Sequence, residues 1–510
     1  MKRSVAVAAS NAKSVLNCPI SASAAIAEQE SEARPFEEIP GPNLFERHFG
    51  RDRTVFRSKF FDIKHARNTR GYDYKNSGKR SIANYFQWLV DLHKRYGPIV
   101  KVEQGFGRGA VVHVFDPEDA RRVFASDGRQ PFIVPLQETT QRYRQLKGMN
   151  PGLGNLNGDE WYRLRSSVQQ VMMRPQAVQK YLPYTNEVAQ ALVDHVRRES
   201  ETSTSGEVDV SKIAGRWALE SSALTVFEKR IGALTDRIEW ADGLVNLNKA
   251  IFRLSAVLKF AFPLYQYFPT PKWKKMVELE DRFYREANLL IDQAIDKLRG
   301  SSELENEMKF ASLLINRKEL NVNDVKIILL SMFSDGLSTT APMLVYNLFN
   351  IATHPDVQAE LRDEVNAAVQ RNEDITPAVL SQLPLLRACI KETFRLFPIG
   401  TEISRIPQKD IVLSNYHIPS GTPVDINTNV LMRWLRDVSR QQDFHPFAFL
   451  PFGFGPRMCA GRRFAEQDLQ VALCRLLQHY RIVHQHGSIE QTYETLLLPK
   501  GCCEFRFEPL

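Results

Sequence analysis

One cysteine near the C-terminus stands in a setting suited to chemistry. Cys459 lies in residues 452–463, a stretch that holds three glycines and a proline. Such a stretch forms neither a regular helix nor a strand, and it lets the backbone approach a large flat group closely. Apolar residues then recur at helical spacing, so Cys459 precedes a helix N-terminus, where free N–H groups and the helix dipole favour a thiolate. Arg457 adds positive charge two residues away.

A single thiolate in a glycine-rich loop indicates a metal site with one protein ligand. Zinc prefers four ligands, and neither a C-x-x-C pair nor a pair of histidines stands near Cys459, so haem iron fits better. The alternative is a buried structural cysteine beside a glycine-rich turn. Five residues at fixed spacing favour haem, because they resemble the haem loop of the cytochrome P-450 family, F-x-x-G-x-R-x-C-x-G. They are Phe452, Gly455, Arg457, Cys459 and Gly461.

The resemblance extends to the arginines that would hold the haem propionates. Trp161 and Arg165 are four residues apart and share one face of a helix. They resemble the family's W-x-x-x-R, in which both side chains hydrogen-bond a propionate, although an ordinary Trp–Arg surface stack is the alternative. The planar donor fork of arginine suits a carboxylate. The resemblance also implies that Arg457 holds a propionate and that Arg405 reaches the second one.

A long helix is predicted over residues 323–353, and its centre resembles the family pattern A/G-G-x-D/E-T-T. Gly336, Thr339 and Thr340 match that pattern. Oxygen activation needs a local bulge over the iron, a hydroxyl near the distal oxygen and a route for protons. Gly336 permits the bulge, and Thr339 can supply the hydroxyl.

The acid that the pattern expects is replaced by Ser338. Asp335 stands four residues before Thr339 and therefore on the same helix face. Our hypothesis is that Asp335, through water, takes the place of the missing acid. The alternative is that Asp335 is a structural residue and that proton delivery is impaired.

A buried ion pair is expected upstream of the cysteine loop. Glu392 and Arg395 form an E-x-x-R pair on a helix and resemble the family's pair, whose role is to fix the fold of the haem loop. Removal of either partner would strand a buried charge. Arg433 is the candidate for a third member of this cluster. The residues that the family carries just before this arginine are missing here. An altered splice form or an imperfect gene model is therefore an open alternative, and retention of haem by the protein depends on whether Arg433 can complete the cluster.

Two pairs of basic residues indicate a docking site for a protein electron donor. Arg387 and Lys391 share a helix face, and Arg462 and Arg463 follow the cysteine loop. The mitochondrial branch of the family carries bases at these places, where they receive an acidic, adrenodoxin-like iron–sulfur ferredoxin that works with a reductase. Complementary charge steers such encounters. Ordinary solvated surface bases are the alternative.

The N-terminus and the composition agree with a mitochondrial location. Residues 1–35 resemble a transit peptide: the first 27 contain eight alanines, five serines and no acid. A secretory signal and a merely disordered tail are the alternatives. Six cysteines in 510 residues do not suggest a disulfide framework, so a reducing compartment is expected.

The charge of the chain is concentrated in one segment. The net charge is +8, and residues 51–80 alone hold ten Lys and Arg against three Asp, a net +7. We expect a solvated loop there, with contact to an anionic membrane surface as the alternative, and no nucleic-acid role.

The sequence contains no run of eighteen apolar residues, so it predicts no membrane-spanning helix. The phenylalanine-rich residues 251–268 would cover an apolar cavity, touch a membrane surface or simply pack in the core.

The resemblance covers residues 36–510 and implies one mainly helical domain with small β-sheets, in which the central helix crosses the haem and the cysteine loop precedes a C-terminal helix. It implies a haem b (iron protoporphyrin IX) monooxygenase that inserts one atom of O2 into a lipophilic substrate, a sterol, steroid or xenobiotic. The expected location is the matrix side of the inner mitochondrial membrane, with peripheral membrane contact. A haem-binding protein without oxygenase activity and a degenerate haem-free paralogue are the alternative functions.

Overall fold

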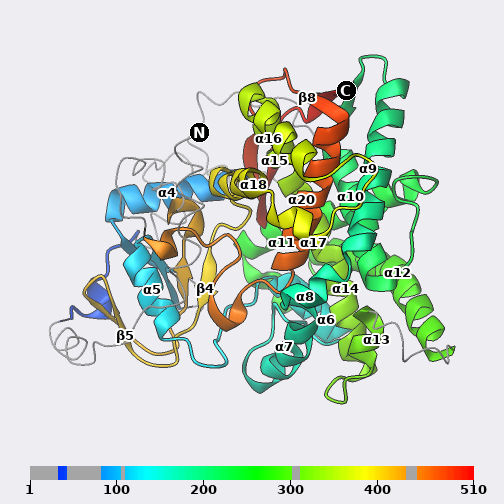
Figure 1. Cartoon of the computed structure of the whole chain (residues 1–510). Helices are drawn as coiled ribbons and strands as arrows, with labels where there is room; N and C mark the ends of the chain where they lie inside the picture. Colours follow the sequence, from blue (N-terminus) through cyan, green and yellow to red (C-terminus); the bar gives the residue numbers. More distant parts are fainter. Residues whose placement is uncertain (1–32, 43–81, 105–108, 301–309, 432–444) are drawn as a thin grey trace. The chain divides into compact units, whose positions relative to one another are not determined.

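The structure is a computed structural model of the whole chain (Figure 1). It divides into two compact units, one of residues 135–401 with 450–510, the other of the described residues up to 134 with 402–449, and each is described by itself. The basic segment 51–80, most of the leader and Arg433 lie outside the described residues, and the predicted single domain over 36–510 stays a prediction. The described residues are 33–42, 82–104, 109–300, 310–431 and 445–510.

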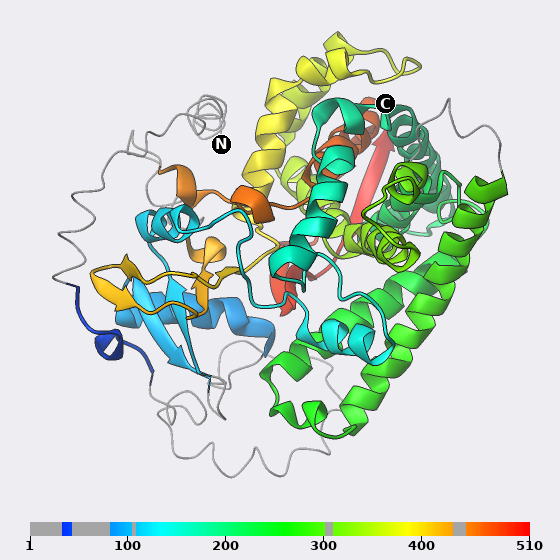
Figure 2. The ribbon, with the colours of Figure 1, turned by 90° about the horizontal axis from the view of Figure 1, so that it is seen from below.

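The larger unit is built of helices around α10 (Val210–Phe227), which is mostly apolar and in which every residue except Ser211, Lys212 and Ser222 is buried. This helix packs against α9, α11, α14 and α15. The longest helix, α12, runs beside α11 (Figure 2). The other helices are α6 (Glu138–Leu146), α7 (Gly158–Met172), α8 (Pro175–Gln179), α9 (Leu182–Thr202), α11 (Ile238–Phe260), η5 (Pro263–Gln266), α12 (Pro271–Gly300), α13 (Phe310–Ile315), α14 (Val322–Ser338), α15 (Thr340–Ala352), α16 (Pro355–Ala368), α17 (Pro377–Ser381), α18 (Pro384–Leu396), η7 (Gly455–Arg457) and α20 (Arg462–His479).

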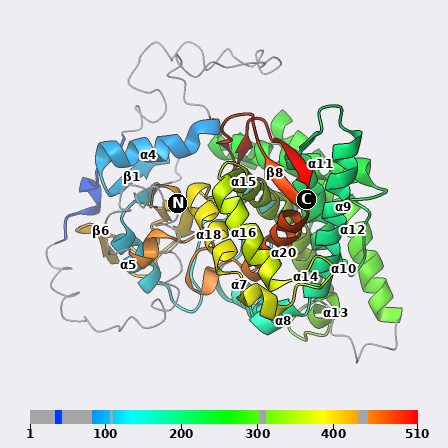
Figure 3. The same ribbon diagram turned by 45° about the horizontal axis from the view of Figure 1, so that its top comes forward.

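Two small antiparallel sheets complete this unit. One has the strand order β3-β11-β8, from Glu207–Asp209, Glu504–Pro509 and Tyr480–Val483, and the other pairs β9 (Glu490–Glu494) with β10 (Leu496–Lys500). Strand β8 follows directly from α20 and lies against it (Figure 3). Leu497 and Phe505 are fully buried, so each sheet covers part of the helical core.

The smaller unit holds a four-stranded sheet under helix α4 (Tyr85–Tyr96). Leu89 and Leu92 of α4 pack on Val100, Val102 and neighbouring apolar side chains of the sheet. The sheet order is β1-β2-β7-β4, from Ile99–Glu103, Ala110–Val114, Val424–Ile426 and Ile403–Arg405, and the other elements are η2 (Phe36–Glu38), η4 (Ile82–Asn84), α5 (Pro117–Ala125), β5 (Ile411–Leu413), β6 (Tyr416–Ile418) and η6 (Pro446–Ala448).

The predicted long central helix is present as α14 and α15, which are separated by one residue. Asn321 starts α14 with a capping box, because its side chain accepts from the Asp324 N–H while the Asp324 carboxylate accepts from the Asn321 N–H. Residues 322–352 are the one stretch of the described chain that is long and apolar enough to cross a membrane, but 61% of its most apolar window is buried inside the protein. It is therefore the core helix of a mainly helical protein with small sheets, as predicted.

Candidate functional site

The cysteine loop folds back on itself before α20 begins. The N–H of Cys459 donates to the carbonyl of Phe452 at 2.9 Å, and the N–H of Met458 donates to Gly455 at 3.0 Å. Gly453 and Gly455 have φ angles of 74° and 72°, a region that glycine enters at little cost. The backbone thus requires two of the three glycines that marked the loop in the sequence, whereas Gly461 has an ordinary φ of −81°.

The start of α20 acts on the Cys459 thiol in the direction that the sequence predicts. Burial raises the pKa of this thiol, whereas hydrogen bonds from the backbone N–H groups of Gly461 and Arg462 and the charge of Arg165 lower it. Desolvation is the larger effect in the protein alone. A bound metal ion would favour the thiolate further, since it competes with the proton for sulfur.

Arg165 lies beside the cysteine loop with an unused donor. Trp161 and Arg165 are 2% and 6% exposed and share the buried face of α7, so the alternative of a surface stack is excluded. The Nη2 atom of Arg165 donates to the carbonyl of Met458 at 2.7 Å and to the Met173 sulfur at 3.0 Å. Within the described residues, its buried Nε has no hydrogen-bond partner. A buried guanidinium with a spare donor fits an anionic group such as a haem propionate.

Arg457 links the cysteine loop to the segment before α7. Its guanidinium lies over the Trp161 ring, 3.9 Å from the ring centroid. It donates to the carbonyl oxygens of Leu153 and Leu156, at 3.3 and 2.8 Å, and to the Asn157 side chain at 2.8 Å. Arg457 therefore holds Trp161 and the cysteine loop together, and its predicted contact with a propionate stays a prediction.

Arg405 belongs to the smaller unit. It is 3% exposed, its Nε donates to the Asp127 carboxylate at 2.8 Å, and its guanidinium lies over the Phe124 ring. The Asp127 side chain is 9% exposed, and this ion pair balances the charge of Arg405 within its own unit. The predicted role of Arg405 at a second propionate stays a prediction.

The central helix is interrupted at Thr339. This residue has φ −123° and ψ −56°, and its hydroxyl donates to the backbone carbonyl of Asp335 at 2.7 Å. The sequence placed the cause of such a bulge at Gly336. The structure gives Gly336 a different role, since a Cβ atom there would lie 2.8 Å from the Ser222 hydroxyl of α10. Gly336 allows two helices to approach closely, and the backbone departs from helical geometry three residues later.

Asp335 shares the electrostatic environment of Cys459. Desolvation raises the pKa of Asp335 to about 6, while the charge of Arg144 lowers it, and the Asp335 charge in turn raises the pKa of the Cys459 thiol. Both side chains remain accessible although the surrounding protein desolvates them. This combination is expected of side chains that line an interior space. Ser338, at the position where the family pattern has an acid, is 6% exposed.

A polar cluster next to Asp335 was not found from the sequence. The Nε of Arg144 on α6 donates to the hydroxyl of Tyr284 on α12 at 2.6 Å. One turn earlier in each helix, the Thr140 hydroxyl donates to Glu280 at 2.9 Å, and burial raises the pKa of Glu280 to about 7. The spacing of Glu280 and Tyr284 marks one face of α12, but no sequence pattern connects α6, α12 and α14.

The predicted Glu392–Arg395 pair is present on α18. The Arg395 guanidinium grips the carboxylate with two donors, at 2.8 and 2.6 Å, and Glu392 is 7% exposed. The third guanidinium nitrogen of Arg395, Nη1, is buried and has no hydrogen-bond partner in the described part of the chain. The predicted third member, Arg433, lies outside the described residues.

The two basic pairs lie on helices that contact each other, α18 and α20. Arg387 and Arg463 are exposed, whereas Lys391 and Arg462 are half-buried. Arg462 pairs with Glu466 at 3.0 Å, and the Nε of Arg463 donates to the Met173 carbonyl at 2.7 Å. The charge of Arg462 is therefore partly balanced, which weakens it as a docking residue.

The helical fold, the accessible thiol held in a glycine loop before a helix, and the buried arginine beside it define a haem-thiolate protein. The comparison with known families agrees, because the model of the family described as cytochrome P450 matches residues 77–506. The chain therefore belongs to the cytochrome P450 family. It is a monooxygenase, and its cofactor is haem b, which proteins of this family bind through a cysteine thiolate.

Named relatives support the family assignment, and two of them carry the word mitochondrial in their names. The chain is 52% identical to "Probable cytochrome P450 CYP44" of Caenorhabditis elegans, with 100% of both chains covered. That alignment spans 527 positions, more than the 510 residues here, so the worm protein has residues that this chain lacks. The chain is also 30% identical to "Cytochrome P450 11B, mitochondrial" of Aquarana catesbeiana (94% of this chain, 90% of the relative) and 28% identical to "Cholesterol side-chain cleavage enzyme, mitochondrial" of Oncorhynchus mykiss (84% and 86%).

Proposed function

We propose that this chain is a mitochondrial monooxygenase that inserts one atom of O2 into a sterol, a steroid or another lipophilic molecule, with electrons from an adrenodoxin-like ferredoxin and its reductase. The observation that carries the proposal is the accessible Cys459 thiol, with the spare donor of buried Arg165 beside it. The frog and trout relatives, whose names place them in mitochondria, support the location and the type of electron donor.

Each candidate residue has one role in this proposal. Cys459 ligates the haem iron in the loop shaped by Phe452 and Gly461. Arg165 offers Nε to a propionate while its Nη2 stays on the Met458 carbonyl. The other propionate contacts come from Trp161 and Arg457.

Bound haem supplies the activation of O2. Asp335 exchanges protons with water, because desolvation raises the pKa of its carboxyl to about 6 while the side chain stays accessible. Thr339 holds a hydroxyl at the interruption of the central helix.

An exposed apolar segment supports peripheral contact with the inner membrane. Within residues 251–268, Ile251 and Phe252 are buried and belong to the core. After the end of α11, Phe262, Tyr267 and Phe268 are 48%, 79% and 52% exposed. Aromatic side chains of this kind bind the interface between lipid headgroups and acyl chains.

The first test is the absorption spectrum of the dithionite-reduced protein under carbon monoxide. A strongly red-shifted Soret band is expected for haem with a thiolate ligand, and Cys459→Ala should abolish that shift. A Soret band at the position typical of a neutral ligand would remove Cys459 from its role. Absence of any Soret band would favour a haem-free paralogue and overturn the proposal.

The electron donor and the substrate need a second test. The purified protein is reconstituted with a mitochondrial ferredoxin and its reductase, and a broad panel of sterols and steroids is offered. Hydroxylated product that depends on ferredoxin is expected. Peroxide release without product from any member of the panel would favour the haem-binding protein without oxygenase activity. A reporter fused to residues 1–40 that remained in the cytosol would count against the mitochondrial location.

A further inference from the structure

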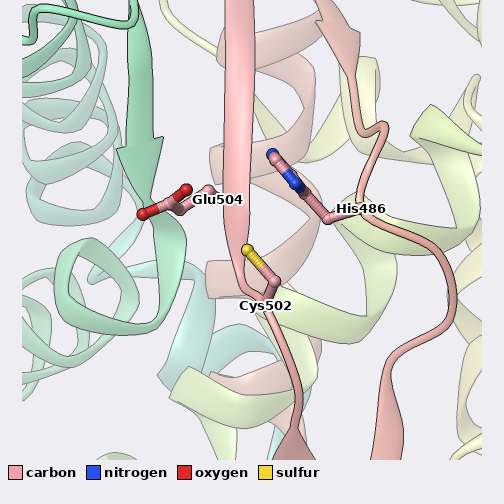
Figure 4. A group of neighbouring side chains, drawn as sticks. All are labelled: His486, Cys502 and Glu504. Carbon is pink, nitrogen blue, oxygen red and sulfur yellow. The ribbon is translucent and has the colours of Figure 1, made fainter.

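Three side chains that commonly bind metal ions meet at the end of the sheet β3-β11-β8. They are His486, in the loop after β8, Cys502, just before β11, and Glu504, the first residue of β11 (Figure 4). One ligand atom from each lies within 4.8 Å of the others. Cys502 is a free, exposed thiol. These residues are far from Cys459 in the sequence, and neither the family assignment nor the proposed function uses them.

A fourth residue orients the histidine. The carboxylate of Glu207, on β3, lies 2.9 Å from the Nε2 atom of His486, and its side chain is only 12% exposed. With Nε2–H donated to Glu207, the Nδ1 atom is the ring nitrogen that carries a free lone pair. A carboxylate behind a histidine is the usual arrangement at metal sites, because it fixes the tautomer and makes the imidazole a stronger ligand.

The backbone around the three ligands is held by His484. Its ring nitrogens lie 2.9 Å from the carbonyl oxygen of Glu504 and 3.2 Å from that of Gly487. The ring also packs on Phe505, 4.6 Å between ring centroids. One side chain thus ties the His486 loop to the first residue of β11, which reduces the ordering that metal binding would require.

We propose that His486, Cys502 and Glu504 bind one Zn²⁺ ion, with Glu207 orienting His486. A thiolate, an imidazole and a carboxylate together suit Zn²⁺ better than Ca²⁺ or Mg²⁺, which prefer oxygen ligands alone. Three protein ligands leave the fourth tetrahedral position to water. The ion would fasten the loop after β8 to the start of β11.

The test uses the haem-loaded full-length protein, because haem then occupies Cys459 and keeps it from competing for zinc. After treatment with a chelator, the protein is titrated with Zn²⁺ by calorimetry, and the zinc-loaded sample is studied by X-ray absorption at the zinc edge. One saturable ion per chain is expected, with one sulfur ligand at about 2.3 Å and nitrogen or oxygen ligands at about 2.0–2.2 Å. A zinc shell without sulfur would overturn the proposal.

Variants separate this site from adventitious zinc. Cys502→Ser and His486→Ala should each abolish the saturable binding, and Glu207→Gln should weaken it roughly 10- to 100-fold. Glu508→Gln, on the same strand but paired with Arg481, is the matched control and should bind zinc like the unaltered protein. Equal zinc affinity in the Cys502→Ser variant and the control would refute the site.

One measurement needs no variant and so does not depend on how the variants fold. Zn²⁺ should slow the alkylation of Cys502 by iodoacetamide at least tenfold, as located by mass spectrometry, while Cys459 stays protected by haem. Alkylation of Cys502 at the same rate with and without zinc would also refute the site. Neither result bears on the monooxygenase proposal, because the haem spectrum of the same sample is recorded independently.

Discussion

Arg395 donates two parallel hydrogen bonds to Glu392, from Nε at 2.8 Å and from Nη2 at 2.6 Å. The two side chains are 17% and 8% exposed, so water does little to screen the pair. Because each charge is desolvated, removal of one partner leaves the other without compensation.

Glu392→Ala should therefore destabilise the protein by about 3–5 kcal/mol, the range for a broken buried pair. The measurement is the denaturant midpoint for loss of the haem absorption band and of helical circular dichroism. Glu278→Ala is the control, because its partner Lys275 lies at a similar distance, 2.8 Å, but both side chains are about half exposed. The control should leave the midpoint unchanged, and equal shifts in the two variants would show that the Glu392 pair is not special.

A second prediction concerns the close approach of α10 and α14. Alanine at position 336 would gain roughly 1 kcal/mol of helix propensity over glycine. Its Cβ would also lie 2.8 Å from the Ser222 hydroxyl, and overpacking of this kind typically costs about 1–3 kcal/mol. We expect Gly336→Ala to lower the melting temperature, and Ser222→Ala to restore most of the loss in the double variant. A more stable Gly336→Ala protein would mean that the contact relaxes freely.

The sequence predicted those parts of the site that depend on local backbone and on short spacings. Gly453 and Gly455 had to be glycine because of their positive φ angles, so the loop around Cys459 left a clear pattern. Glu392 and Arg395 are three residues apart on one helix, so their pairing needed nothing from the rest of the fold. The same holds for the shared face of Trp161 and Arg165.

Contacts between distant segments could not be predicted. Arg144 reaches Tyr284 and influences Asp335 from another helix, and it is more than a hundred positions away from each of them in the sequence. For the same reason Gly336 was explained by a local bulge, although its neighbour is Ser222 on α10. A side chain's burial and its long-range partners follow from tertiary packing, which cannot be inferred from a single sequence.

A third prediction tests the route of protons past the central helix. Asp335→Asn keeps the size of the side chain but cannot carry a proton, and Thr339→Ala removes the hydroxyl. Each should lower product formation, up to roughly 100-fold for a lost proton donor, while hydrogen peroxide release rises. Product and peroxide are measured per electron consumed in the reconstituted system.

Ser338→Ala is the control for that experiment, because Ser338 occupies the position of the family's acid and its hydroxyl donates to the Asp335 carbonyl. Its coupling of electrons to product should be unchanged. Uncoupling by Ser338→Ala, with normal coupling in Asp335→Asn, would show that Ser338 and not Asp335 delivers the proton.

A fourth prediction follows from the buried carboxyl of Glu280, whose pKa is raised from 4.5 to about 7. Between those two values the folded protein binds more protons than the unfolded chain, so Glu280 lowers stability as the pH rises through this window. Glu280→Gln removes that titration and still accepts the hydrogen bond of Thr140. Its stability advantage should therefore grow from nearly nothing at about pH 4.5 to a few kcal/mol at about pH 8. Denaturant midpoints at several pH values measure it, and a constant difference would contradict the shift.

The last prediction concerns electron transfer. Arg387 is exposed on α18, one turn from Lys391, whereas the charge of Arg462 is partly balanced by Glu466. If an acidic ferredoxin docks at these bases, the double substitution Arg387→Glu and Lys391→Glu should slow stopped-flow reduction by ferredoxin about tenfold at low salt, because attraction becomes repulsion. The dependence of the rate on salt should reverse its sign, since screening now helps the encounter. Arg462→Glu should have a smaller effect, and Lys212→Glu, at an exposed position on α10, should have almost none. Equal effects of all three charge changes would indicate a general field of the protein, and the docking role of Arg387 and Lys391 would then be withdrawn.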